Sequence, residues 1–247
     1  MKSLSILFSI ILFGTTVQAQ EMSGRITYEQ QIKLEFSFEG QDMQGLESMI
    51  PKSRKSTMQL LFTEEASLYK KSPVEEGGDS EFTNDSGAVI KIAVSGADNE
   101  TYRDIQNKNL VEKREFFGKN FLIKGDKTYA WKIAGEQKEI LGYACQKATL
   151  QDGDRNVVAW FTPQIPLATG PEGYGNLPGM ILEVNINEGK RTIVATEIAM
   201  GEVDAKSVKE PTKGKEVTRE EFVAIVEEKT KEMEETSGGN RIIIRRN

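Results

Sequence analysis

Hydrophobic and polar side chains alternate near the start of the chain. Between residues 26 and 38 most even-numbered positions are apolar, whereas the odd-numbered positions hold Thr, Glu, Gln, Lys and Ser. A period of two turns successive side chains to opposite faces of a strand, so this pattern predicts a strand with one face in solvent. Met58, Leu60 and Phe62 resume the alternation and predict a second strand.

Further short apolar segments follow between residues 101 and 200, and polar turns separate them at hairpin spacing. The clearest pair is 180–186 and 192–200, which flank the turn Asn187-Glu188-Gly189-Lys190 and predict a β-hairpin. Strands in this rhythm are typical of an antiparallel sandwich, a barrel or a strongly curved sheet. We therefore predict a mainly β fold over residues 20–204, a curved antiparallel sheet resembling a half-barrel or an open barrel.

Two later regions depart from the strand pattern. Residues 72–100 are rich in Ser, Gly, Asp, Glu and Asn, with one apolar stretch at 89–94, and predict a long mobile loop with one short strand. After a polar linker, Thr218 and Glu221 have the spacing of a capping box, which predicts an amphipathic helix at about 219–235. We expect residues 205–247, including this helix and the C-terminal tail, to pack on the same domain.

The N-terminus has the pattern of a secretory signal peptide. Lys2 precedes a mostly apolar stretch at 4–13, and Val17-Gln18-Ala19 suits a signal peptidase. A ten-residue helix spans only about 15 Å, half the hydrocarbon thickness of a bilayer. We predict cleavage after Ala19 and no transmembrane segment in the mature chain. The expected location is the periplasm or the outer membrane, or outside the cell.

Composition excludes several classes of chemistry. The chain has no histidine and one cysteine, Cys145, so a Ser-His-Asp triad, a His-ligated metal, a Cys-His pair and an intrachain disulfide are all excluded. The formal net charge of -6 argues against nucleic acid as a partner. No spacing rule selects a catalytic pair among the 38 carboxylates, and we predict no catalytic residue, cofactor or metal site. Calcium at the turn with Asp152 and Asp154 stays open as an alternative.

The most distinctive stretch of the sequence lies between residues 159 and 184. Four of the seven prolines and four glycines fall between residues 163 and 179. Proline fixes φ and glycine permits φ > 0, so this stretch predicts a rigid crossover between two strands. It is either a structural cap over the sheet or a loop that binds a ligand or partner. The candidate binding residues are Trp160, Phe161, Tyr174, Leu177, Pro178 and Gly179.

Part of this stretch, Asn176-Leu177-Pro178-Gly179-Met180-Ile181, resembles the signature of the GLPGLI family, exported Bacteroidetes proteins with a Porphyromonas-type domain of unknown function. Asn176 replaces the first glycine of the signature, and asparagine tolerates φ > 0. The resemblance also covers residues 24–28, 114–124 and 141–148. It implies an exported, mostly β protein and supplies no established reaction. A similarity to the half-barrels of LolA-type lipoprotein carriers is an analogy of fold alone.

These observations favour a non-enzymatic binding protein of the periplasm or envelope. Its partner would be an envelope protein or an apolar, lipid-like ligand, because an amphipathic set of strands must cover its apolar face. A carboxylate-dependent hydrolase that works without histidine is one alternative. A structural component of the envelope is another.

Overall fold

The computed structural model describes most of the chain that follows the predicted signal peptide. The described residues are 22–33, 35–39, 52–73, 80–83, 89–92, 99–201, 203–236 and 241–245. The predicted signal peptide, residues 1–19, lies outside these ranges. So do residues 74–79, 84–88 and 93–98 of the predicted mobile loop.

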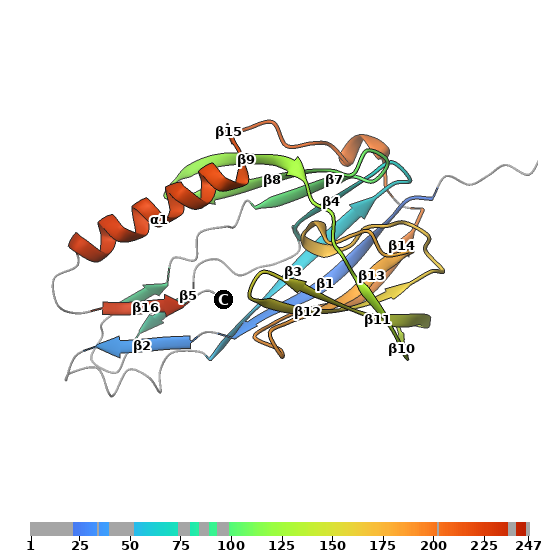
Figure 1. Ribbon diagram of the computed structural model, residues 1–247, viewed down its shortest axis with the longest axis horizontal. Coiled ribbons are helices and arrows are strands. Elements are labelled where there is room, and N and C mark those ends of the chain that lie inside the picture. The colour runs from blue at the N-terminus through green and yellow to red at the C-terminus, as the bar shows by residue number, and fades with distance from the viewer. Residues whose placement is uncertain are drawn as a thin grey trace, which may run out of the picture.

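Twelve strands of the described chain form one open, curved sheet (Figure 1). All neighbouring strands are antiparallel except β15, which runs parallel to β9. The predicted mainly β fold with a curved, open antiparallel sheet is therefore confirmed. In spatial order the strands are β10 (Lys132–Ile140), β11 (Tyr143–Asp152), β12 (Arg155–Thr162), β13 (Met180–Ile186), β14 (Arg191–Met200), β1 (Gly24–Lys33), β3 (Ser53–Phe62), β4 (Ala66–Lys71), β7 (Glu100–Asp104), β8 (Asn109–Phe116), β9 (Lys119–Asp126) and β15 (Lys215–Val217).

The strand register identifies one continuous face of the sheet, which we call the concave face. Residues paired directly across antiparallel strands lie on the same face. Starting from β1, successive pairing partners carry this face across five strand pairs. The row consists of Ile26, Leu60, Tyr69, Thr101, Glu112 and Ile123.

Short strands complete the β structure. β2 (Glu35–Glu39) pairs with β16 (Arg241–Arg245), and β5 (Ser80–Thr83) pairs with β6 (Val89–Ile92). The alternating segment at 26–38 thus comprises β1 and β2. Within the predicted loop at 72–100, β6 falls on the apolar stretch that was expected to form a strand, and β5 is additional. A 3-10 turn, η2 (Ala205–Ser207), precedes Val208, which packs on Leu61 and Leu68.

Helix α1 (Arg219–Thr236) begins where the capping box predicts. The Glu221 backbone N–H donates to Thr218 Oγ1 at 3.1 Å, and the Thr218 N–H donates to Glu221 Oε2 at 2.7 Å. Phe222 and Ile225 pack against Phe121 of β9 and its neighbours, so the helix lies against the end of the sheet (Figure 1). No helix within the described ranges is long and apolar enough to cross a membrane.

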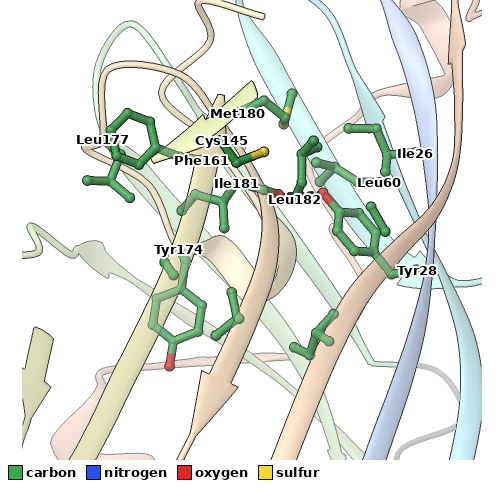
Figure 2. Close-up of a cluster of buried hydrophobic side chains, with 14 of the residues drawn as sticks. Ile26, Tyr28, Leu60, Cys145, Phe161, Tyr174, Leu177, Met180, Ile181 and Leu182 are labelled. Carbon is green, nitrogen blue, oxygen red and sulfur yellow. Dashed lines mark hydrogen bonds between the residues drawn. The ribbon is translucent and has the colours of Figure 1, made fainter. Parts of the chain in front are cut away.

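The largest apolar core lies between the concave face and the crossover that joins β12 to β13 (Figure 2). Ile26, Leu60 and Leu182 are fully buried in it. Tyr28 is also fully buried, and its hydroxyl donates to the Ile181 carbonyl oxygen at 2.7 Å. A shift of register between β12 and β13 lets the consecutive residues Ile181 and Leu182 both enter the core.

Candidate functional site

The crossover, residues 163–179, leaves the sheet at the end of β12 and returns at the start of β13. Its short 3-10 turn, η1 (Pro171–Gly173), contacts β4, β7 and β13, so the curved sheet wraps around it (Figure 1). Backbone hydrogen bonds tie it to β13: Met180 N–H donates to Ile165 O at 2.9 Å, and Ile181 N–H donates to Thr169 O at 3.0 Å. The crossover is a cap that covers the concave face.

The glycines of the crossover are required by close packing. A Cβ at Gly179, where φ is 154°, would lie 2.0 Å from the Thr162 carbonyl oxygen. A Cβ at Gly175 would lie 2.6 Å from the Ala168 carbonyl oxygen. Neither distance is compatible with a side chain, so only glycine fits at these positions. Asn176 has φ of 66°, which agrees with asparagine standing in for the first glycine of the signature.

A buried arginine fastens the crossover to β7. Arg103 is 1% exposed, and its guanidinium donates to the Gly173 carbonyl oxygen at 3.0 Å and to Asn176 Oδ1 at 3.1 Å. Asn176 Oδ1 also accepts from the Tyr129 backbone N–H at 3.3 Å. Burial lowers the pKa of Arg103, and its Nε has no partner within the described part of the chain. Arg103 therefore holds the crossover through uncharged oxygens.

Three aromatic rings meet where the crossover contacts the segment between β9 and β10. The Tyr174 ring centroid lies 5.1 Å from that of Tyr129 and 6.0 Å from that of Trp131. Trp131 Nε1 donates to the Gly175 carbonyl oxygen at 2.8 Å. Tyr129 and Tyr174 are 7% and 3% exposed as whole residues, and neither hydroxyl has a hydrogen bond to any described residue. Neither hydroxyl oxygen is a buried atom without a partner, so both reach the surface. Figure 2 shows the Tyr174 hydroxyl pointing away from Leu177 and Phe161.

Six charged side chains form two ion-paired groups beside these tyrosines, and we call them together the charged mouth. Glu112 Oε2 lies 2.7 Å from Arg114, and Glu112 Oε1 pairs with Arg219 at the start of α1. Asp152 lies 3.2 Å from Lys127 Nζ and also pairs with Arg155. Four separate segments, β8, the β9–β10 connection, the β11–β12 hairpin and α1, thus contribute to it. The members are Glu112, Arg114, Lys127, Asp152, Arg155 and Arg219.

The charges of the mouth act on one another and on the tyrosines. Burial alone would raise the pKa of Glu112, but Arg114 and Arg219 outweigh it and lower that pKa, so Glu112 is ionised at neutral pH. Burial lowers the pKa of Lys127 in spite of Asp152. Burial raises the pKa of Tyr174 to about 12, and Arg155, Asp152 and Glu112 are near enough to influence it. Burial likewise raises the pKa of Tyr129.

The predicted binding residues do not form one surface. Phe161, Tyr174, Leu177 and Gly179 are buried beneath or within the crossover, whereas Pro178 is exposed. Successive strand residues face opposite ways, so Trp160 lies on the other face from Phe161. On that face Lys138 Nζ is 4.5 Å from the Trp160 ring centroid. Of the six candidates, only Tyr174 borders the charged mouth.

Sequence reasoning missed Arg103 and the charged mouth. Arg103 sits between polar neighbours in β7, and nothing local distinguishes it from a solvent-exposed arginine. Glu112 and Arg219 are 107 positions apart, and only the fold joins them. A calcium ion at the 152–154 turn is disfavoured, because the Asp152 carboxylate already pairs with Lys127 and Arg155. No group of three metal-binding side chains occurs in the described residues.

Comparison with protein families and curated proteins gives a limited match. A family model described as "Protein of unknown function (Porph_ging)" matches residues 151–183, which hold β12, the crossover and the start of β13. The match supports a Porphyromonas-type domain of unknown function. No curated protein matches the chain.

Two solved structures share the fold. Both are of PNGF-II, one in space group C2 and one in P21, and each has a TM-score of 0.54 and 16% sequence identity to this chain. The alignments cover 83% of this chain but 32% and 33% of the PNGF-II chains, so the chain spans about a third of PNGF-II. At this identity the likeness concerns the fold alone.

Proposed function

We propose that this chain is an exported, non-enzymatic binding protein of the GLPGLI type, and that its binding site is the charged mouth. The observation that carries the proposal is the gathering of charged side chains beside Tyr129 and Tyr174, whose hydroxyls have no partner among the described residues and reach the surface. Tyrosine hydroxyls both donate and accept hydrogen bonds, so hydroxyls at the surface of a charged group can pair with polar groups of a partner. The crossover then acts as the scaffold that positions Tyr174.

Binding is favoured over catalysis by the state of the reactive groups. A carboxyl group acts as a general acid or base most effectively when its pKa lies near the working pH. Glu112 is held ionised by two arginines, and Asp152 is paired with two cations. The Cys145 thiol is 1% exposed, and burial raises its pKa to about 11, which makes it a poor nucleophile. These features speak against a hydrolase that uses these groups.

A polar partner is favoured over an apolar, lipid-like ligand. The carrier hypothesis depends on an apolar concave face that a ligand can cover. The crossover itself covers this face, with Ile165 and Leu177 each 1% exposed. The groups at the edge of the crossover are instead tyrosine hydroxyls and ion-paired charged side chains, so we propose a protein or other polar partner in the envelope.

Export is part of the proposal and rests on the pattern of residues 1–19 and on the resemblance to the GLPGLI family. Expression of the full chain in a bacterial host, followed by mass spectrometry of the purified protein, tests it. We expect an N-terminus at Gln20 and recovery from the periplasm or outer membrane. An uncleaved chain that stays in the cytoplasm would contradict export.

Binding at the charged mouth is tested by native mass spectrometry of the mature chain from Gln20, purified from bacterial envelope fractions. We expect a reproducible co-purifying molecule that is lost in the double variant Arg155→Gln/Arg219→Gln. The matched control is Lys138→Gln, which removes an ion-paired cation on the opposite face and should retain the molecule. A passenger that survives the double variant would place binding elsewhere, and an empty wild-type protein would contradict the proposal.

A further inference from the structure

We infer that β10, at one edge of the twelve-stranded sheet, pairs with β10 of a second copy of this chain, and that Gln137 lies on the twofold axis of the dimer. This interface contains no residue of the charged mouth, so it goes beyond the proposed function. It is carried by the juxtaposition, on one edge strand, of outward-facing backbone groups, exposed apolar side chains and a self-complementary order of charges.

The two edges of the sheet differ in how they are protected. At one edge the sheet ends in β15, which is only three residues long, and α1 packs against the neighbouring β9. At the other edge β10 pairs with β11 and with no further strand of the described chain (Figure 1). Most residues of β10 are exposed. A long edge strand offers unpaired N–H and C=O groups to another chain.

The hairpin that joins β10 to β11 determines which backbone groups face the open edge. Its two-residue turn, 141–142, has positive φ at both positions, so the pair that closes it is hydrogen-bonded. Such pairs alternate along antiparallel strands, so Glu139 and Gln137 turn their N–H and C=O groups to the open edge. The N–H of Ala144, opposite Glu139, accordingly donates to Gln164 Oε1 at 2.9 Å on the other side of β11.

The charges of β10 select one register for twofold pairing of the strand with itself. Centring the pair on Glu136, Lys138 or Glu139 would place that residue opposite its own copy, and like charges directly opposite each other are destabilising. Centring the pair on Gln137 places Lys138 opposite Glu136 of the second copy, and the twofold axis repeats this contact. Gln137 also faces the open edge, so the two central residues can exchange backbone hydrogen bonds.

The same register extends ion pairs that exist within one copy. Lys138 Nζ lies 2.5 Å from Glu183, and Lys147 Nζ lies 2.8 Å from Glu136. Lys138 lies over the Trp160 ring and Lys147 is paired with Trp160 across β11 and β12, so these side chains share one face. In the dimer, the charges of Glu183 and Lys138 are followed by those of Glu136 and Lys147 of the second copy. The signs alternate along this row, which favours a second copy as the partner.

Two exposed apolar side chains flank the centre of β10. Ile133 is 51% exposed and Leu141 is 47% exposed, and each lies four positions from Gln137. The register centred on Gln137 therefore places Leu141 beside Ile133 of the second copy, once on each side of the axis. Dimerisation removes apolar surface from water at both contacts, which stabilises the dimer.

The strength of association is tested by sedimentation of the mature chain from Gln20 over a series of concentrations. The register shift between Ile133 and Gln137 keeps the regular paired stretch short. We therefore expect a reversible monomer–dimer equilibrium with a dissociation constant of about 100 µM, as for a small interface.

Proline at the axis tests whether backbone pairing holds the dimer. Gln137→Pro removes an N–H that faces the open edge, where proline is compatible with the strand's own sheet. We expect it to raise the dissociation constant about tenfold or more. Gln137→Thr is the matched control, because it changes the same side chain but keeps the N–H, and it should dimerise like the wild type.

Cross-linking tests the register and keeps the inference falsifiable if the proline variant fails to fold. Gln137→Cys and Glu139→Cys are compared in a chain that also carries Cys145→Ala, so the introduced thiol is the only one. In the proposed register the two Cα atoms at position 137 lie about 5.5 Å apart, within the range of a disulfide. Those at position 139 lie about 14 Å apart. Under mild oxidation, Gln137→Cys should form a covalent dimer about tenfold faster or more.

Three results would overturn the inference. The first is a chain that stays monomeric at about 1 mM, tenfold above the expected dissociation constant. The second is a dimer that a folded Gln137→Pro variant leaves intact. The third is a Glu139→Cys variant that cross-links as fast as Gln137→Cys, which would show another register or random collision.

Discussion

The crossover and helix α1 both cover the concave face, but they are attached to it in different ways. The crossover is held by backbone hydrogen bonds, by buried Arg103 and by glycines that admit no Cβ. The helix contacts the sheet through a few half-buried side chains such as Phe222 and Ile225, and most of its surface is exposed. The crossover is thus a fixed part of the core, and the helix is an added layer. The charged mouth lies at their junction and takes Arg219 from the helix.

The largest expected effect tests how rigidly the crossover is fixed. Gly179→Ala should lower the free energy of unfolding by about 3 kcal/mol or more, because the new Cβ would meet the Thr162 carbonyl oxygen. Gly118→Ala is the matched control: its φ is also positive, at 69°, but no atom lies within 4 Å of the added Cβ, so the loss should be about 1 kcal/mol. Denaturant unfolding measures the free energy of unfolding of both variants. If the two variants lost equal stability, the backbone of the crossover would be able to move away from the new Cβ.

A second pair of variants compares the two layers directly. Leu177→Ala removes a side chain that is 1% exposed under the crossover and should cost about 3 kcal/mol. Phe222→Ala removes a larger but half-buried ring between α1 and β9 and should cost about 1.5 kcal/mol, since less apolar area leaves water on folding. Chemical denaturation gives the free energy of unfolding of each variant, and the two values are comparable if both variants have the m-value of the wild type. If Phe222→Ala proved the more damaging, the helix would belong to the core.

The contrast between the layers also explains which features the sequence could predict. The alternation at 26–38, the hairpin around Asn187 and the capping box at Thr218 are local signals, and β1, the β13–β14 pair and α1 agree with them. The candidate site depended on non-local contacts. Trp160 and Phe161 are adjacent in sequence, but strand geometry places them on opposite faces. The hydrogen bond between Arg103 and Asn176 joins residues 73 positions apart, and no local sequence pattern predicts it.

The junction between the layers is predicted to respond to pH. In the folded state the pKa of Glu112 is lowered, so its contribution to stability is present above the ordinary carboxyl pKa of about 4.3 and is lost as pH falls through the lower folded value. Glu112→Gln should cost about 2 kcal/mol at pH 7. The difference between wild type and variant should shrink below about pH 4. Unfolding curves between pH 7 and pH 3 measure it, and a difference independent of pH would contradict the ion-pair explanation.

The smallest expected effect concerns the helix alone. Thr218→Ala removes the hydroxyl that accepts from the Glu221 N–H and should lower the free energy of unfolding by about 1 kcal/mol. Thr212→Ala, in the linker before β15, is a control that lacks a capping contact and should change stability by less than about 0.5 kcal/mol. Hydrogen exchange of the α1 amides distinguishes local fraying from global loss. Because the helix is an added layer, exchange should accelerate in its first turn while the amides of β12 and β13 keep their protection. Equal acceleration in those strands would mean that α1 and the crossover unfold as one unit.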